Sequence, residues 1–155
     1  MKIEIVAVGK LKERFWKDAV AEYVKRLGGY AQVRVMEVAD RDPAKCGGEG
    51  KAREREGADI LKACGPGHVI LLAIDGKERS SEGFAHRLES LMNSGKSDIV
   101  FVIGGSTGVS DEVRKRADET LSFGPITLPH NLARVVLVEQ VYRAFKIMRG
   151  EPYHK

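Results

Sequence analysis

A glycine-rich turn at residues 104–108, with the sequence GGSTG, is the first place in this chain where ligand chemistry could occur. It follows the apolar run of residues 99–103, and Ser110 can cap a helix after it. Small residues between a strand and a helix let backbone amides approach a ligand closely. The turn lacks the GxGxxG spacing, the P-loop lysine and an acidic residue at the end of a following strand to hold a ribose. Dinucleotide and nucleoside triphosphate sites are therefore disfavoured, and a purely structural turn is the alternative.

A second candidate is the segment FGPITLPH at residues 123–130. It places Gly124, Pro125 and Pro129 around an apolar run, directly before an apolar helix. Proline restricts the backbone, so we expect an ordered loop whose main-chain groups point in fixed directions. Such a loop can recognise the edge of an adenine through backbone hydrogen bonds.

Arg134 is the third candidate, because a helical wheel places it among apolar positions and opposite the polar face of its helix. An arginine in such surroundings is rarely left without a partner. It could pair with a phosphate or with a substrate oxygen. The alternative is that Arg134 lies in a loosely formed first turn and reaches solvent.

The C-terminal sequence RGEPYHK gathers cationic groups, an aromatic ring and an imidazole, supplied by Arg149, Tyr153, His154 and Lys155. Stacking of one base on an aromatic side chain contributes roughly 1 to 3 kcal/mol, and the cations would add contacts to phosphate. The alternative is a frayed terminus without a function.

Strand and helix patterns alternate along the chain, which predicts the α/β class with a largely parallel sheet. In such sheets ligands bind outside the carboxyl ends of the strands. Residues 41–50 are expected to form a mobile loop. The helix at residues 11–27 should pack on the sheet through Phe15, Ala19, Tyr23 and Leu27. The expected strands are residues 3–8, 33–39, 68–75, 99–105 and 121–130, the last interrupted at Gly124, and the other helices are residues 51–64, 80–92, 111–119 and 133–148.

The last helix is unusually apolar, since eleven of the sixteen residues in 133–148 are apolar. So wide an apolar arc must be covered on more than one side, which a second copy of the chain could do. The sequence therefore predicts a homodimer through this helix. A central helix buried within its own monomer is the alternative.

The composition is that of one globular domain, residues 1–155, with 43% hydrophobic and 31% charged residues. The apolar run at the N-terminus is too short for a signal peptide or a membrane span, which indicates a cytoplasmic protein. The two cysteines and four histidines lack the spacing of metal ligands, so we expect no metal. The net charge of +4 mildly favours polyanionic partners. Residues 130–155 contain five Lys or Arg and two Asp or Glu, whereas residues 1–66 contain fourteen Lys or Arg and eleven Asp or Glu. The positive excess is therefore concentrated at the C-terminal end.

Three segments carry a resemblance to a known family: VAVGKLKERFW, VIGGSTG and LPHNLARVVLVEQVYRAFKIMRGEPYHK. Together they resemble the RlmH family of SPOUT-class methyltransferases, over essentially the whole chain. The resemblance implies a SPOUT-type fold with a C-terminal trefoil knot, an obligate dimer and S-adenosylmethionine as cofactor. It also implies methylation at N3 of a pseudouridine, in a stem-loop of 23S ribosomal RNA within the assembled ribosome.

Carried over residue by residue, the resemblance implies the following cofactor contacts: Leu72, Gly104, Phe123, Gly124, Pro125, Ile126, Thr127 and Leu128. Because N3 must lose its proton, the reaction needs a proton acceptor or a charge that stabilises the base anion. We expect Arg134 to stabilise that anion or to orient phosphate. Tyr153 and His154, from the other subunit, would position the base and assist proton removal, with His130 as the competing base.

Two other functions compete with this interpretation. A non-catalytic RNA-binding or ribosome-associated dimeric factor would use the basic tail but would not need a cofactor loop. A Rossmann-like oxidoreductase would bind nicotinamide at residues 104–108, and the glycine spacing argues against it.

Overall fold

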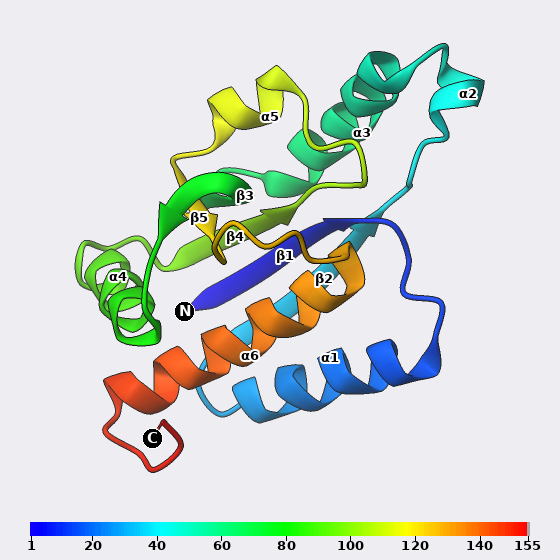
Figure 1. Ribbon diagram of the computed structural model, residues 1–155. Coiled ribbons are helices and arrows are strands. Elements are labelled where there is room, and N and C mark those ends of the chain that lie inside the picture. Colours follow the sequence, from blue (N-terminus) through cyan, green and yellow to red (C-terminus); the bar gives the residue numbers. More distant parts are fainter. Residues whose placement is uncertain (155) are drawn as a thin grey trace.

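The computed structural model describes residues 1–154, and its centre is a five-stranded sheet in which every pair of neighbouring strands is parallel (Figure 1). The strand order is β2-β1-β4-β3-β5. The prediction of a largely parallel α/β sheet is confirmed. The strands are β1 (Lys2–Val8), β2 (Gln32–Val38), β3 (His68–Glu78), β4 (Asp98–Ile103) and β5 (Glu119–Ser122).

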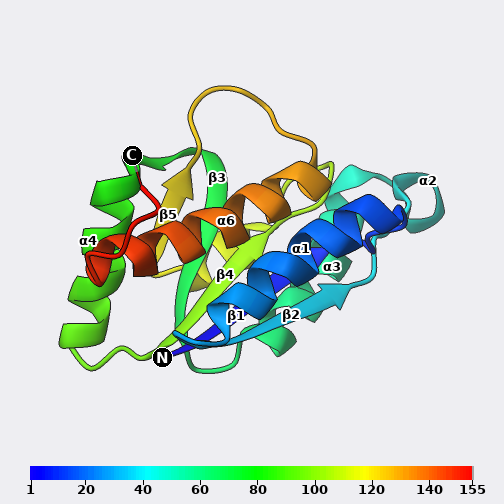
Figure 2. The ribbon, with the colours of Figure 1, turned by 90° about the horizontal axis from the view of Figure 1, so that it is seen from below.

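Helices cover both faces of the sheet and make a three-layered molecule (Figures 1 and 2). One face is covered by α1 (Arg14–Leu27), α4 (Ser81–Asn93) and α6 (His130–Met148), and the other by α3 (Glu49–Cys64) and α5 (Asp111–Arg116). The short helix α2 (Pro43–Cys46) precedes α3. Because both faces are covered, the central strands are apolar throughout, and five of the six residues of β4 are buried.

Helix α6 lies between α1 and α4 and packs on both of them. It begins at His130, three residues earlier than expected, and Arg134, Leu137, Val138 and Val141 are among its buried residues. Much of its apolar surface is therefore covered within one protomer. The flanks at Leu132, Val135 and Val136 remain partly exposed.

The prediction of a strand across residues 121–130 is wrong from residue 123 onward. Strand β5 ends at Ser122, and residues 123–129 form an arch that returns to the start of α6 (Figure 2). The backbone turns at Gly124, whose φ is +101°, a conformation that glycine adopts without strain. Pro125 and Pro129 lack the N–H that would continue the ladder.

Three other features also differ from expectation. Helix α5 ends at Arg116 instead of residue 119, because the Asp118 carboxylate accepts a hydrogen bond from the Val69 amide and starts the pairing of β5. Residues 41–50 contain α2, whose first turn is capped by Asp42. Phe15, expected in the packed stripe of α1, is 63% exposed.

An irregularity in β3 shapes the carboxyl edge of the sheet. Leu121 of β5 is in register with both Leu72 and Lys77, so residues 73–76 bulge out of the ladder. The Ser122 hydroxyl donates a hydrogen bond to the Ile74 carbonyl and holds the bulge in place. A Cβ at Gly76 would lie only 2.9 Å from the carbonyl oxygen of Ala73 and 2.9 Å from the carbonyl carbon of Leu121.

Replacing Gly76 with alanine should destabilise the protein by about 1–3 kcal/mol, because backbone atoms on two sides leave no room for a methyl group. Urea unfolding measures this change. Gly29→Ala is the matched control, since nothing lies within 4 Å of a Cβ there. Equal unfolding midpoints for the two variants would contradict the tight packing of the bulge.

Candidate active site

An apolar pocket opens at the carboxyl edge of the sheet, where Ile103, Leu72 and Leu121 lie in register on three adjacent strands. The arch of residues 123–129 covers it, and it holds about 620 Å³ of space, counting the solvent at its mouth. A predominantly apolar lining with a few polar groups is typical of small-molecule sites. Seven of the eight predicted cofactor contacts line it: Leu72, Gly104, Phe123, Gly124, Ile126, Thr127 and Leu128. Pro125 belongs to the same arch but does not line the pocket.

Five lining residues were missed from the sequence: Ala73, Ile74, Ile103, Leu121 and Ala133. Ile103 could have been found, because it ends the apolar run of β4. Ile74 could not, since its place depends on the bulge in β3. Ile74 and Ile126 are 56% and 74% exposed, so the rim of the pocket presents apolar side chains to solvent.

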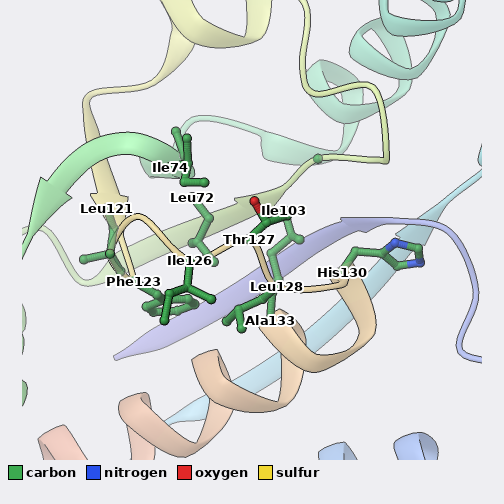
Figure 3. A pocket seen from close by; sticks show the side chains of 13 residues that line it. Leu72, Ile74, Ile103, Leu121, Phe123, Ile126, Thr127, Leu128, His130 and Ala133 are labelled. Carbon is green, nitrogen blue, oxygen red and sulfur yellow. The ribbon is translucent and has the colours of Figure 1, made fainter.

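His130 lies at one end of the apolar pocket, away from Leu121 and Phe123 (Figure 3). It is the first residue of α6 and also lines a neighbouring pocket with Gly9 and Asn131. The competing base of the sequence hypothesis is thus placed beside the predicted cofactor contacts.

Arg134 is fully buried, with 1% of its surface exposed, so the solvent-exposed alternative is wrong. Its Nη1 donates to Glu37 Oε2 at 2.7 Å and its Nη2 to the Gly9 carbonyl at 3.0 Å. Glu37 Oε2 also accepts from the Leu11 amide. Burial works to raise the pKa of Glu37, but these hydrogen bonds outweigh it and the net pKa is lowered. Arg134 therefore ties α6 to the ends of β1 and β2, and it does not line the apolar pocket.

The C-terminal residues lie at the other end of α6 from His130 (Figure 1). The Tyr153 hydroxyl donates to Glu139, and the His154 ring contacts Glu82 at 2.6 Å and Arg143 at 3.2 Å. Burial and the contact with Tyr23 raise the pKa of Tyr153 above its ordinary value, so its phenol is a donor at neutral pH. Neither residue lines the apolar pocket of its own protomer. Lys155 lies outside the described residues.

Helix α3 braces the glycine turn from behind. Arg53 Nη1 donates to the Thr107 carbonyl at 3.2 Å, and a Cβ at Gly57 would meet the Ser110 hydroxyl. Glu56, 3% exposed, places its Oε2 2.9 Å from where a Cβ of Gly105 would be. That oxygen has no hydrogen-bond partner within residues 1–154. The sequence pattern of residues 51–64 gave no sign of this brace.

The family model described as Predicted SPOUT methyltransferase matches residues 1–154. The chain belongs to the SPOUT methyltransferase family. Among its relatives, the ribosomal RNA large subunit methyltransferase H of Listeria monocytogenes is 55% identical and that of Bacillus cytotoxicus 54% identical, each over 100% of both chains. The resemblance to the RlmH family is thereby confirmed.

Solved structures support the same fold at low sequence identity. A probable methyltransferase from Bordetella pertussis aligns with a TM-score of 0.59 at 12% identity, over 92% of this chain and 95% of that one. A probable methylase family protein from Haemophilus influenzae aligns with a TM-score of 0.56 at 16% identity, over 99% and 70%. These likenesses concern the fold alone.

SPOUT methyltransferases use S-adenosylmethionine as methyl donor, and the apolar pocket of this SPOUT chain fits such a molecule. At Gly104 a Cβ would lie 2.6 Å from Val109 Cγ1, so only glycine leaves the turn in place. Apolar walls suit an adenine ring, and the backbone of the arch can hydrogen-bond its edge. Leu72, Gly104 and residues 123–128 are the groups that would hold the cofactor.

Two findings bear on other kinds of site. Within residues 1–154, no three side chains of His, Cys, Asp or Glu come together as metal ligands would. No described helix has the length and apolar character needed to cross a bilayer.

The buried Glu56 carboxyl should make the free energy of unfolding depend on pH. Burial raises its pKa, with Asp40 adding to the rise and Arg41 opposing it. Because the pKa of Glu56 is higher in the folded protein than its ordinary value of 4.5, its contribution to the stability of the fold is complete below pH 4.5. That contribution is lost as the pH rises through the folded-state pKa. Glu56→Gln should remove this loss, about 1.4 kcal/mol for each unit by which the pKa is raised.

The measurement is the free energy of unfolding in urea at pH 5 and pH 8 for both proteins. Glu54→Gln, an exposed residue on the same helix, is the matched control. If wild type and Glu56→Gln lose the same stability between the two pH values, Glu56 is not the group that titrates.

Proposed function

We propose that this SPOUT methyltransferase methylates N3 of a pseudouridine in a stem-loop of 23S ribosomal RNA, acting in the cytoplasm on the assembled ribosome. The observation that carries the proposal is the apolar pocket, which gathers seven of the eight expected cofactor contacts in a chain 55% identical to a ribosomal RNA large subunit methyltransferase H. Under this proposal the whole chain is one catalytic domain, and its C-terminal part forms the trefoil knot.

The chemistry assigns separate tasks to the residues. Bound S-adenosylmethionine supplies an electrophilic methyl group on a sulfonium. The protein must place the N3 atom in line with that group, and it must either accept the N3 proton or stabilise the negative charge that its loss leaves on the base. His130, at the end of the apolar pocket, and His154, from a partner subunit, are the two candidate bases. The raised pKa of Tyr153 favours a role in stacking and positioning over proton removal.

Arg134 acts in this proposal as a positioning residue. Two of its guanidinium nitrogens are used by Glu37 and Gly9, and its Nε is buried without a partner in residues 1–154. From this place it holds the first turn of α6, and with it His130, against the ends of β1 and β2. Stabilisation of the base anion is then indirect, through the geometry of that turn.

A homodimer through α6 completes the proposed site. The partly exposed flank of α6 at Leu132, Val135 and Val136 offers an apolar face to a second copy. Tyr153 and His154 lie away from the apolar pocket of their own protomer. In the dimer, these two residues of one subunit would reach the apolar pocket of the other.

The proposed reaction predicts transfer of labelled methyl from S-adenosylmethionine to ribosomes that lack the modification. Mass spectrometry of the nucleosides should find N3-methylpseudouridine, and protein-free RNA should accept far less label. The competing function, a non-catalytic RNA-binding dimer, predicts RNA binding without label transfer and without heat of cofactor binding in calorimetry.

The shared site predicts complementation between two inactive variants. His154→Ala removes the tail imidazole, and Gly104→Val displaces the glycine turn that lines the apolar pocket, because its side chain clashes with Val109. Mixed dimers carry one intact pocket facing one intact tail, so mixing after mild unfolding should restore up to about half of the activity per heterodimer. Full single-turnover activity of His154→Ala alone at neutral pH would remove this imidazole from the mechanism and leave His130.

A further inference from the structure

A second pocket, here called the polar pocket, lies beside the apolar one and shares His130 with it. Gly9, Lys10, Lys12, Asp40 and Asn131 also line it. It lies where β1 and β2 end and α6 begins, and holds about 1380 Å³ of space, counting the solvent at its mouth. Space of this size next to the cofactor residues is available to a larger ligand.

One residue that lines the polar pocket, Asn131, carries an unused hydrogen-bond acceptor. Gly9 has a φ of +90°, and a Cβ there would point toward the His130 ring, 3.6 Å from Nε2. The Asn131 Oδ1 atom is buried and has no hydrogen-bond partner among residues 1–154. Buried polar atoms in native proteins are normally paired, so this amide is suited to an N–H donor from a ligand. The edge of a nucleobase presents such donors.

The segment that borders the polar pocket at Lys10 and Lys12 is basic, and two aromatic residues follow it in the sequence. Residues 10–17, KLKERFWK, carry four cations against one acid. Lys10 and Lys12 are exposed and form no ion pair with residues 1–154. Phe15 is 63% exposed, with its ring 5.0 Å from that of Trp16. Cations beside an outward aromatic ring are the groups with which proteins bind single-stranded nucleic acid.

The acidic groups of the pocket narrow the choice of ligand. Glu37 is occupied by Arg134 and Leu11, while Asp40 and Glu13 face the pocket beside the lysines. These carboxylates disfavour a small free anion inside the pocket. A ligand with a neutral ring inside and phosphates outside, at the rim, matches this distribution.

We propose that the polar pocket receives an unpaired nucleobase of the RNA substrate, with Asn131 bonded to its edge, an adjacent base stacked on Phe15, and the backbone phosphates on Lys10 and Lys12. This assignment rests on the proposed function and adds the surface by which the RNA is held. It places RNA contacts at the N-terminal segment in addition to the C-terminal tail.

The test compares steady-state methylation of unmodified ribosomes by variants of the rim. Phe15→Ala should raise the KM for ribosomes about fivefold or more, the effect of losing one stacked base. Lys10→Ala/Lys12→Ala should also raise it, and should lower the slope of log affinity against log salt by about 1.5. Asn131→Ala should raise KM, while kcat and the cofactor Kd stay near wild type in all three.

Lys25→Ala/Lys62→Ala is the matched control, with the same charge change at two exposed sites away from the polar pocket. Rim variants whose KM and salt slope equal those of this control would overturn the proposed RNA surface alone. Sedimentation that shows loss of dimer in Phe15→Ala would overturn it as well, because a second copy then covers the ring. No methylation by wild type would overturn the proposed function itself.

Discussion

The buried ion pair of Arg134 with Glu37 is the interaction on which the geometry of both pockets depends. It joins residues 97 positions apart in the chain and fixes the start of α6 to the ends of β1 and β2. Removing one partner of a buried pair typically costs about 3–5 kcal/mol, because the other charge is left uncompensated. Glu37 is partly exposed, so solvent would recover some of that cost. The orientation of the first turn of α6, which carries His130 and Asn131, depends directly on this contact.

The elements that could be predicted from the sequence are those whose pattern is set by burial alone. The apolar runs of β3 and β4 reflect strands covered on both faces, and the period of α4 reflects one covered face. The errors fall where a single long-range contact decides the boundary. Asp118 ends α5 early by bonding to Val69, and the bulge after Leu72 could not be foreseen because β5 must be in place to create it.

The candidate site was predictable in part, and through the residues that constrain the backbone more than through burial. Gly104 and the arch residues stood out because glycine and proline are informative about backbone geometry wherever they occur. Arg134 stood out on the helical wheel, but its partner Glu37 lies on a distant strand, and no local pattern links the two. The polar pocket was missed because its walls come from three separate segments. Phe15 was read as a packed residue, since its spacing on α1 matches the buried stripe.

The two pockets differ in chemistry, and each suits one of the two molecules that the proposed reaction brings together. Apolar walls suit the cofactor, and a polar floor with a basic rim suits RNA. Among the described residues lining the apolar pocket, His130 is the only titratable one, so one protomer offers a single candidate for the N3 proton. If His130 serves as the base, the chemistry is complete within one subunit and a dimer matters only for holding RNA. If the base is His154, the apolar pocket of an isolated protomer lacks it, and dimerisation becomes a condition of catalysis.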